Sequence, residues 1–213
     1  MLKSLPNILT FLRLVLSVVV LVMILYSPQV ENRSFFLDIA FVLFIVAGLT
    51  DVVDGHVARR FNATSKFGRI IDPLVDKVLV CGAFICFAII GEPKLFSLSP
   101  VPLAVIHWLV VAVLLCREVT VTVLRHMAEA KGIDFRATAS GKIKMLLQSF
   151  AIGTVLVKMA HVGEKAWGHW FTTITFVAMV VATIVSGVLA TRRSTSQQQP
   201  TEERSHDSSS VSA

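Results

Sequence analysis

The sequence predicts an all-α integral membrane protein, with six transmembrane helices around a cytosol-facing polar cavity and a short amphipathic helix at the N-terminus. Hydrophobic residues make up 54% of the 213 residues, charged residues only 16%, and the mean hydropathy is +0.74. An ordinary soluble domain carries about 25% charged residues. The net charge of +6 is distributed between apolar runs, so the expected partner is a lipid bilayer and not a nucleic acid.

The apolar runs give the positions of the six spans. Residues 1–13 (MLKSLPNILTFLR) form a basic, amphipathic lead-in, and Leu14 to Tyr26 is the first span. A secretory signal peptide would begin in a similar way, but no small-residue cleavage site follows, which favours an uncleaved span. The other spans are expected at about Phe35–Arg60, Pro73–Gly91, Val101–Arg125, Ser140–Ala160 and Trp170–Ala190.

The C-terminal segment differs in composition from the rest of the chain. From Arg192 onward it is rich in Ser and Gln and has no apolar periodicity, which is typical of disordered segments. The sequence therefore predicts one membrane domain over residues 1–191 and a disordered cytoplasmic tail over 192–213.

The second and third spans are short if their charged ends are excluded. Ile39–Thr50 and Val78–Gly91 are both below the roughly 20 residues that a helix needs to cross a bilayer. They cross only if neighbouring aspartates and Lys77 lie inside the membrane or at its surface. Ionisable groups at such depth are costly and usually functional, so these spans predict a polar cavity.

The basic residues predict the orientation of the chain, because cytoplasmic connections carry an excess of Lys and Arg. Sixteen basic residues fall on one side and four on the other. The sixteen are Lys3, Arg13, Arg59, Arg60, Lys66, Arg69, Lys77, Arg117, Arg125, Lys131, Arg136, Lys142, Lys144, Arg192, Arg193 and Arg204. The four are Arg33, Lys94, Lys158 and Lys165. Both termini and the cavity are therefore expected to face the cytoplasm.

The stretch DVVDGHVARRFNATSKFGRIIDPLVD contains four aspartates at the junction of the second and third spans. Asp51 and Asp54 are three residues apart, and Asp72 and Asp76 are four apart, so each pair lies on one face of a helix. A chain reversal between the pairs would bring them together. Buried carboxylates need a partner or a metal ion, so we expect an anionic, oxygen-rich site.

Several kinds of chemistry suit such a site. Carboxylates favour Mg²⁺ or Mn²⁺ over zinc, and two such ions can bridge a phosphate-bearing substrate. One aspartate can instead take a proton from a hydroxyl group. Gly55 and Gly68 allow close approach of a nucleotide, and Arg59 suits phosphate or a carboxylate. Two simpler interpretations stay open: Asp72 before Pro73 suits the start of a helix, and the neighbouring Arg and Lys residues suit membrane anchoring.

A second polar cluster is expected at the cytoplasmic ends of the fourth and fifth spans. Arg117 and Arg125 are eight residues apart, close to one helical face, and Lys142 and Lys144 open the next helix. Such cations suit an anionic ligand that carries a phosphate group. Anchoring by positive charge is the alternative.

The pattern Asp51-x2-Asp54-Gly55-x2-Ala58-Arg59-x8-Gly68-x3-Asp72-x3-Asp76 resembles, at all eight fixed positions, the signature of the CDP-alcohol phosphatidyltransferase family. Members of this family join an alcohol to the phosphate of a CDP-linked substrate and release CMP. The resemblance implies that the four aspartates hold two divalent cations, that Asp76 is also the base, and that the protein is a homodimer. It implies a CDP site formed by Asn7, Thr10, Gly55, Ala58, Arg59, Ser65 and Gly68.

Within that family, three further stretches resemble the phosphatidylglycerophosphate synthases: LPNILTFLRL, Arg117-Glu118-x6-Arg125 and Gly141-Lys142-x-Lys144. The resemblance implies CDP-diacylglycerol as donor, sn-glycerol 3-phosphate as acceptor, and a bacterial cytoplasmic membrane as location. Met145 departs from this pattern, because a Thr usually follows the second lysine. Inositol phosphate, serine and phosphatidylglycerol remain alternative acceptors, and intramembrane aspartates would also suit a cation transporter.

Overall fold

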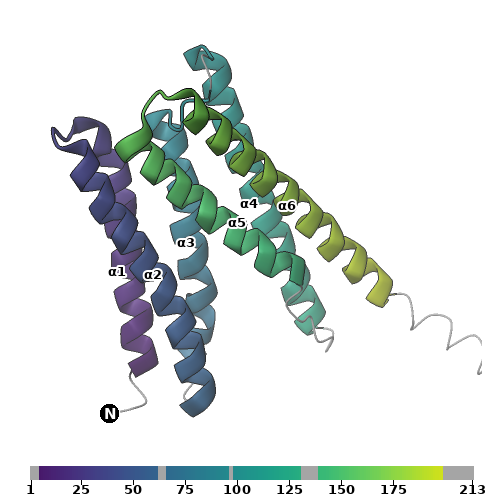
Figure 1. Cartoon of the computed structure of the whole chain (residues 1–213). Coiled ribbons are helices and arrows are strands. Elements are labelled where there is room, and N and C mark those ends of the chain that lie inside the picture. Colours follow the sequence, from purple (N-terminus) through teal and green to yellow (C-terminus); the bar gives the residue numbers. More distant parts are fainter. Residues whose placement is uncertain (1–4, 62–65, 96–97, 131–138, 199–213) are drawn as a thin grey trace, which may run out of the picture.

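The computed structural model describes residues 5–61, 66–95, 98–130 and 139–198, with side chains except at 5–9, 51–61, 66–74, 76, 129–130, 139–140, 142 and 193–198. These residues form six α-helices and no strand (Figure 1). The helices are α1 (Leu5–Tyr26), α2 (Arg33–Phe61), α3 (Lys66–Ile90), α4 (Pro100–Ala130), α5 (Ala139–Val157) and α6 (Ala166–Gln198).

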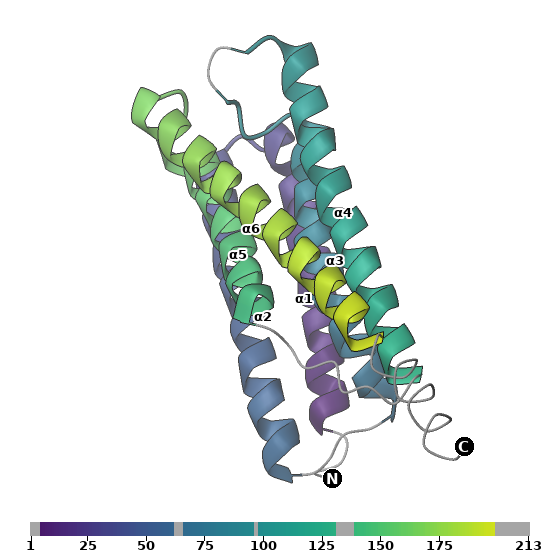
Figure 2. The same ribbon diagram turned by 90° about the vertical axis from the view of Figure 1, so that its right-hand side faces the viewer.

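Consecutive helices run in opposite directions, so their connections alternate between two ends of the bundle (Figures 1 and 2). We call the end at which α2 stops and α3 begins the aspartate end. The start of α1, the end of α4, the start of α5 and the end of α6 lie there too (Figure 2). The first and last helices therefore begin and end on the same side of the molecule.

Length and apolarity make this helical bundle an integral membrane protein. Within the described part of the chain, five segments are long and apolar enough to cross a bilayer: Thr10–Gln29, Arg33–Thr50, Pro100–Ala128, Ile143–Val162 and Ala166–Arg192. In α3 the apolar part is only Lys77–Ile90, about 21 Å at 1.5 Å per residue, against a hydrocarbon core of about 30 Å. The polar first part of α3 must therefore contribute to the crossing.

The core lies where α1 packs against both α2 and α3, and where α4 and α5 pack against α6. Buried apolar residues from all six helices form one cluster, which includes Val20, Phe44, Phe84, Leu114 and Met179. The Phe84 and Phe176 rings meet edge to face at 5.8 Å. Many Val, Leu, Ile and Phe side chains on the outer faces are exposed, as expected for surfaces that contact lipid tails.

The opposite end is closed by a glycine turn and by ion pairs. Gly91 follows α3 with φ of +72°, and the Glu92 N–H donates to the Phe87 carbonyl at 3.0 Å, which is the Schellman arrangement. Glu92 also pairs with Arg33 at 3.2 Å. Lys94 pairs with Glu164 at 3.1 Å; this hydrogen bond raises the pKa of Lys94 and lowers the pKa of Glu164.

Three predicted boundaries are corrected. The lead-in is not a separate amphipathic helix, because α1 runs without interruption from Leu5 to Tyr26. The predicted tail is helical over 192–198, as part of α6, because an established helix gains one hydrogen bond for each added residue. The third helix begins at Lys66, seven residues before the predicted Pro73.

Candidate active site

The two aspartate pairs lie on neighbouring segments of the chain at matching heights. Asp51 is ten residues before the end of α2, and Asp76 is ten residues after the start of α3. Asp54 is seven residues from its helix end and Asp72 is six from its own. Because an α-helix rises 1.5 Å per residue, each pair lies roughly 10–15 Å in from the aspartate end. The chain therefore reverses direction between α2 and α3, as the sequence predicted.

Asp72 does not cap a helix. Pro73 is the eighth residue of α3, so Asp72 lies in the second turn and not at the start. The side chains of all four aspartates lie outside those that the structure describes. Among the side chains that it does describe, no group of three or more His, Cys, Asp or Glu residues is placed to hold a metal ion. The metal-binding role of the aspartates stays a prediction.

One face of α1 is buried toward α2 and α3 and contains polar side chains near the aspartate end. Thr10, predicted to bind CDP, is 6% exposed, and Arg13 is only 1% exposed. The Ser17 hydroxyl donates to the Arg13 carbonyl at 2.7 Å. From the sequence, Arg13 is expected only as one of the positive charges on the cytoplasmic side. Its position one turn after Thr10, on the same helical face, was the signal that it points inward.

Lys77, directly after Asp76, connects α3 to α4. Its ammonium donates to the Thr122 hydroxyl, which in turn donates to the Glu118 carbonyl at 2.6 Å. The predicted base therefore sits next to a residue whose side chain is bound to the neighbouring helix.

Two of the four predicted acceptor-site cations meet on one carboxylate. The Glu118 Oε1 atom accepts from Arg117 Nη1 at 3.0 Å and from Lys144 Nζ. Arg117 Nη2 also donates to the Ser186 hydroxyl at 2.6 Å. These contacts join α4, α5 and α6. The side chains are 12% exposed at Arg117, 13% at Glu118 and 5% at Lys144, so the group carries a net charge of +1 in a shielded position.

The other two cations are placed differently. Arg125 is exposed. Eight residues of α-helix make two full turns and about 80° more, so Arg125 does not lie on the same face of α4 as Arg117. The side chain of Lys142 lies outside the described set. Glu118 and Ser186 were not among the predicted site residues, since neither residue type by itself indicates a phosphate site.

The other predicted CDP-binding residues are located by backbone only. Asn7 lies on α1, Gly55, Ala58 and Arg59 lie on α2, and Gly68 lies on α3. Ser65 falls outside the described residues. Their predicted contacts with CDP therefore stay predictions.

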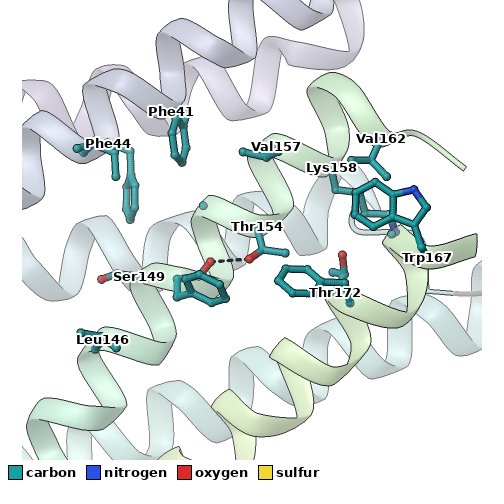
Figure 3. Close-up of a pocket in the computed structure, with 15 residues that line it drawn as sticks. Phe41, Phe44, Leu146, Ser149, Thr154, Val157, Lys158, Val162, Trp167 and Thr172 are labelled. Carbon is teal, nitrogen blue, oxygen red and sulfur yellow. Dashed lines mark hydrogen bonds between the residues drawn. The ribbon is translucent and has the colours of Figure 1, made fainter. Parts of the chain in front are cut away.

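An apolar cavity of about 550 Å³ lies between α2, α5 and α6. Figure 3 shows Phe41 and Phe44 of α2 facing α5, with Trp167 and Thr172 of α6 on the other side. Several residues of its lining, such as Leu146 and Trp167, are also exposed on the outer surface, so the cavity opens toward the membrane. Its lining contains none of the predicted polar site residues.

Comparison with known proteins agrees with the aspartate pattern. The family model described as CDP-alcohol phosphatidyltransferase matches residues 3–191. A Mycobacterium tuberculosis protein named probable phosphatidylglycerophosphate synthase is 31% identical over 185 residues, which cover 87% of this chain and 78% of that protein.

Two further relatives are named CDP-diacylglycerol–glycerol-3-phosphate 3-phosphatidyltransferase. The Bacillus subtilis protein is 38% identical over 116 residues, 54% of this chain and 53% of that protein. The Cereibacter sphaeroides protein is 36% identical over 154 residues, 72% of this chain and 63% of that protein. Because the family model spans all six helices, the chain belongs to the CDP-alcohol phosphatidyltransferase family.

Proposed function

We propose that the protein transfers the phosphatidyl group of CDP-diacylglycerol to sn-glycerol 3-phosphate and releases CMP. One observation carries the proposal: the eight-position aspartate signature lies on two antiparallel helices, at the end of the bundle where Arg117, Glu118 and Lys144 form a largely buried group of net charge +1. The names of the Bacillus subtilis and Cereibacter sphaeroides relatives support the same donor and acceptor.

The residues of the signature suit a pair of divalent cations. Four carboxylates at matching heights on two helices are a donor set that Mg²⁺ or Mn²⁺ prefers, so Asp51, Asp54, Asp72 and Asp76 would hold them. When bound, such ions would balance the negative charge of the diphosphate and of the departing CMP. Comparing the rate of CMP release with Mg²⁺ and with Mn²⁺ would decide which of the two ions the protein uses.

The donor would lie partly in the bilayer and partly in the site. Its acyl chains remain among the lipid tails beside the apolar outer faces, while its diphosphate enters at the aspartate end. Asn7, Thr10 and Arg59 would contact the CDP group, and Gly55 and Gly68 would let the backbone approach it. Arg59 suits the phosphate of CMP as that group leaves.

The reaction is a single displacement at phosphorus. Asp76 accepts the proton from a hydroxyl of glycerol 3-phosphate, and that oxygen forms a bond to the phosphorus that carries diacylglycerol. The bond from this phosphorus to the bridging oxygen breaks, and CMP departs with that oxygen. Arg117 and Lys144 would bind the phosphate of the acceptor and orient its hydroxyl. Lys142 stays a predicted contributor, whereas Arg125 is exposed and lies off the face of Arg117.

The orientation and assembly of the protein belong to the same proposal. The sixteen-to-four distribution of basic residues supports a cytoplasmic aspartate end, with both termini in the cytoplasm. The bacterial relatives support a bacterial inner membrane as the location. A homodimer is supported by the family resemblance alone. Light scattering on the detergent-solubilised protein, corrected for the detergent, would separate a dimer from a monomer.

The product identifies the reaction. Protein in liposomes with CDP-diacylglycerol, Mg²⁺ and isotope-labelled glycerol 3-phosphate should yield phosphatidylglycerophosphate, identified by mass spectrometry. Label that enters lipid only with inositol phosphate, serine or phosphatidylglycerol as acceptor would assign another acceptor. Cation flux across the same liposomes with no lipid product would support a transporter instead.

A further inference from the structure

Polar side chains from four helices converge at one turn of α4. Arg117 and Glu118 belong to this turn, Lys144 reaches it from α5 and Ser186 from α6. Lys77 reaches it from α3 through Thr122. Because the segments of α4, α5 and α6 involved are apolar enough to span a membrane, so many polar groups at one point require an explanation beyond anchoring.

The charges of Arg117, Glu118 and Lys144 are incompletely balanced. The largely buried Arg117 and the buried Lys144 share one carboxylate oxygen, Glu118 Oε1, which leaves a net charge of +1 on these three side chains. Arg117 Nε is buried and has no hydrogen-bond partner among the described residues. A buried donor without a partner is costly, and an anionic ligand with several acceptor oxygens would satisfy both the charge and this N–H group.

We propose that Glu118 is a positioning residue that holds Arg117 and Lys144 in place for the phosphate of the acceptor. The proposal rests on the proposed function and adds a residue to it. Without Glu118 the two long cationic side chains would repel each other and lose their common anchor. With it, one charge is neutralised, and the geometry of the two cations is fixed before the acceptor arrives, which lowers the entropic cost of binding.

The same turn of α4 links the acceptor cations to the predicted base. Thr122 follows Glu118 by four residues and is hydrogen-bonded to its carbonyl, while it accepts from Lys77 next to Asp76. The distance between the acceptor phosphate site and Asp76 is therefore set by contacts among α3, α4 and α5 and not by a loop. In glycerol 3-phosphate the short carbon chain limits how far the reacting hydroxyl can lie from the phosphate. The distance from the acceptor phosphate site to Asp76 therefore affects which acceptor fits.

The test is a comparison of Glu118→Gln, Glu118→Asp and wild type, with KM determined separately for glycerol 3-phosphate and CDP-diacylglycerol. Glu118→Gln keeps the shape and removes the charge. It should raise the KM for glycerol 3-phosphate about tenfold or more and leave the KM for CDP-diacylglycerol unchanged. Glu118→Asp should recover most of the loss. Glu164→Gln is the matched control, because it makes the same change in an ion pair at the opposite end, and it should leave both constants unchanged.

Ser186→Ala provides a second, gentler variant. It removes one hydrogen bond to Arg117 and should raise the KM for glycerol 3-phosphate about threefold. This variant decides the question if Glu118→Gln does not fold.

The outcomes separate the two proposals. Equal changes in both KM values and kcat, or no change in either KM, would overturn the positioning role. A wild-type protein that releases no CMP with glycerol 3-phosphate would overturn the proposed function, and this inference with it.

Discussion

Asp76 combines two predicted roles, as a metal ligand and as the base that accepts the acceptor's proton. Asp76→Asn retains the size of the side chain and removes the proton acceptor, so turnover should fall at least about a hundredfold. Binding of CDP-diacylglycerol, measured by calorimetry in detergent, should remain detectable. Loss of donor binding in a variant that is still folded would contradict the assignment of Asp76 as the base.

The stem of Arg117 lies against α6, which allows a test that removes no polar group. A Cβ added at Gly187 would lie 3.3 Å from Arg117 Cγ, so Arg117 must shift by a few tenths of an ångström in Gly187→Ala. If the position of Arg117 matters, the KM for glycerol 3-phosphate should rise about twofold to threefold.

Gly153→Ala is the control for this change. Its added Cβ would be similarly close, 3.1 Å, to the Phe41 ring in the apolar cavity, far from the predicted acceptor site along α5. Its KM for glycerol 3-phosphate should equal that of wild type. A rise of the same size in both variants would show a general packing effect and not an effect on Arg117.

Single residues were predictable where their type and spacing carry the chemistry. The sequence points to Arg117 and Lys144, which the structure brings together on Glu118, because cations in apolar spans have few structural uses. The same reasoning applies to the aspartate pairs, whose role stays a prediction. Glu118 and Ser186 do not, because their importance comes from which helices lie next to α4, and one sequence does not determine that packing. The burial of Arg13 was accessible from helical periodicity and was missed.

At the level of helices, the number and approximate positions of the six spans were predicted correctly, and the boundaries were less accurate. The sequence predicts a third span that begins at Pro73, and proline is common in the first turn of a helix. The helix extends seven residues further toward the N-terminus, so Pro73 is its eighth residue. This extension moves Asp72 from a capping position to the second turn of α3.

Gly91 ends α3 in a conformation that other residues adopt at a cost. Its φ is +72°, and an added Cβ would meet no atom within 4 Å, so Gly91→Ala should lose only the backbone term, about 1–2 kcal/mol in the free energy of unfolding. Gly48→Ala is the matched control: it also has open space and lies inside α2, where Ala is favoured over Gly by about 1 kcal/mol. Thermal unfolding in detergent should therefore show a lower midpoint for the first variant and not for the second. Equal midpoints would contradict the turn geometry.

At the level of the whole molecule, the alternating helices put the aspartate pairs and the Arg117–Glu118–Lys144 cluster at one end. The Lys94–Glu164 pair lies at the other end, in the connections from α3 to α4 and from α5 to α6. The topology follows from six apolar runs with short connections, so the sequence was sufficient to predict it. How α4, α5 and α6 meet at Glu118 was not predictable, because it depends on which faces of long, uniformly apolar helices pack together.

The orientation of the bundle is testable with single cysteines introduced into a variant in which Cys81, Cys86 and Cys116 are replaced by Ala. Glu164→Cys at the opposite end should react with a membrane-impermeant maleimide in intact cells, and Arg192→Cys at the aspartate end should react only after the membrane is permeabilised. This follows from the excess of basic residues at the aspartate end. The reverse labelling pattern would place the aspartate end outside the cytoplasm.

The central claim is that this bundle uses its aspartate pairs to transfer a phosphatidyl group to glycerol 3-phosphate. The most direct measurement is CMP release by the purified protein with CDP-diacylglycerol and Mg²⁺, with glycerol 3-phosphate, inositol 1-phosphate and serine compared as acceptors. We predict release that depends on glycerol 3-phosphate and is lost in Asp76→Asn. Release with another acceptor would retain the aspartate mechanism and contradict the assignment of the basic cluster, and no release from folded protein with any acceptor would contradict the account as a whole.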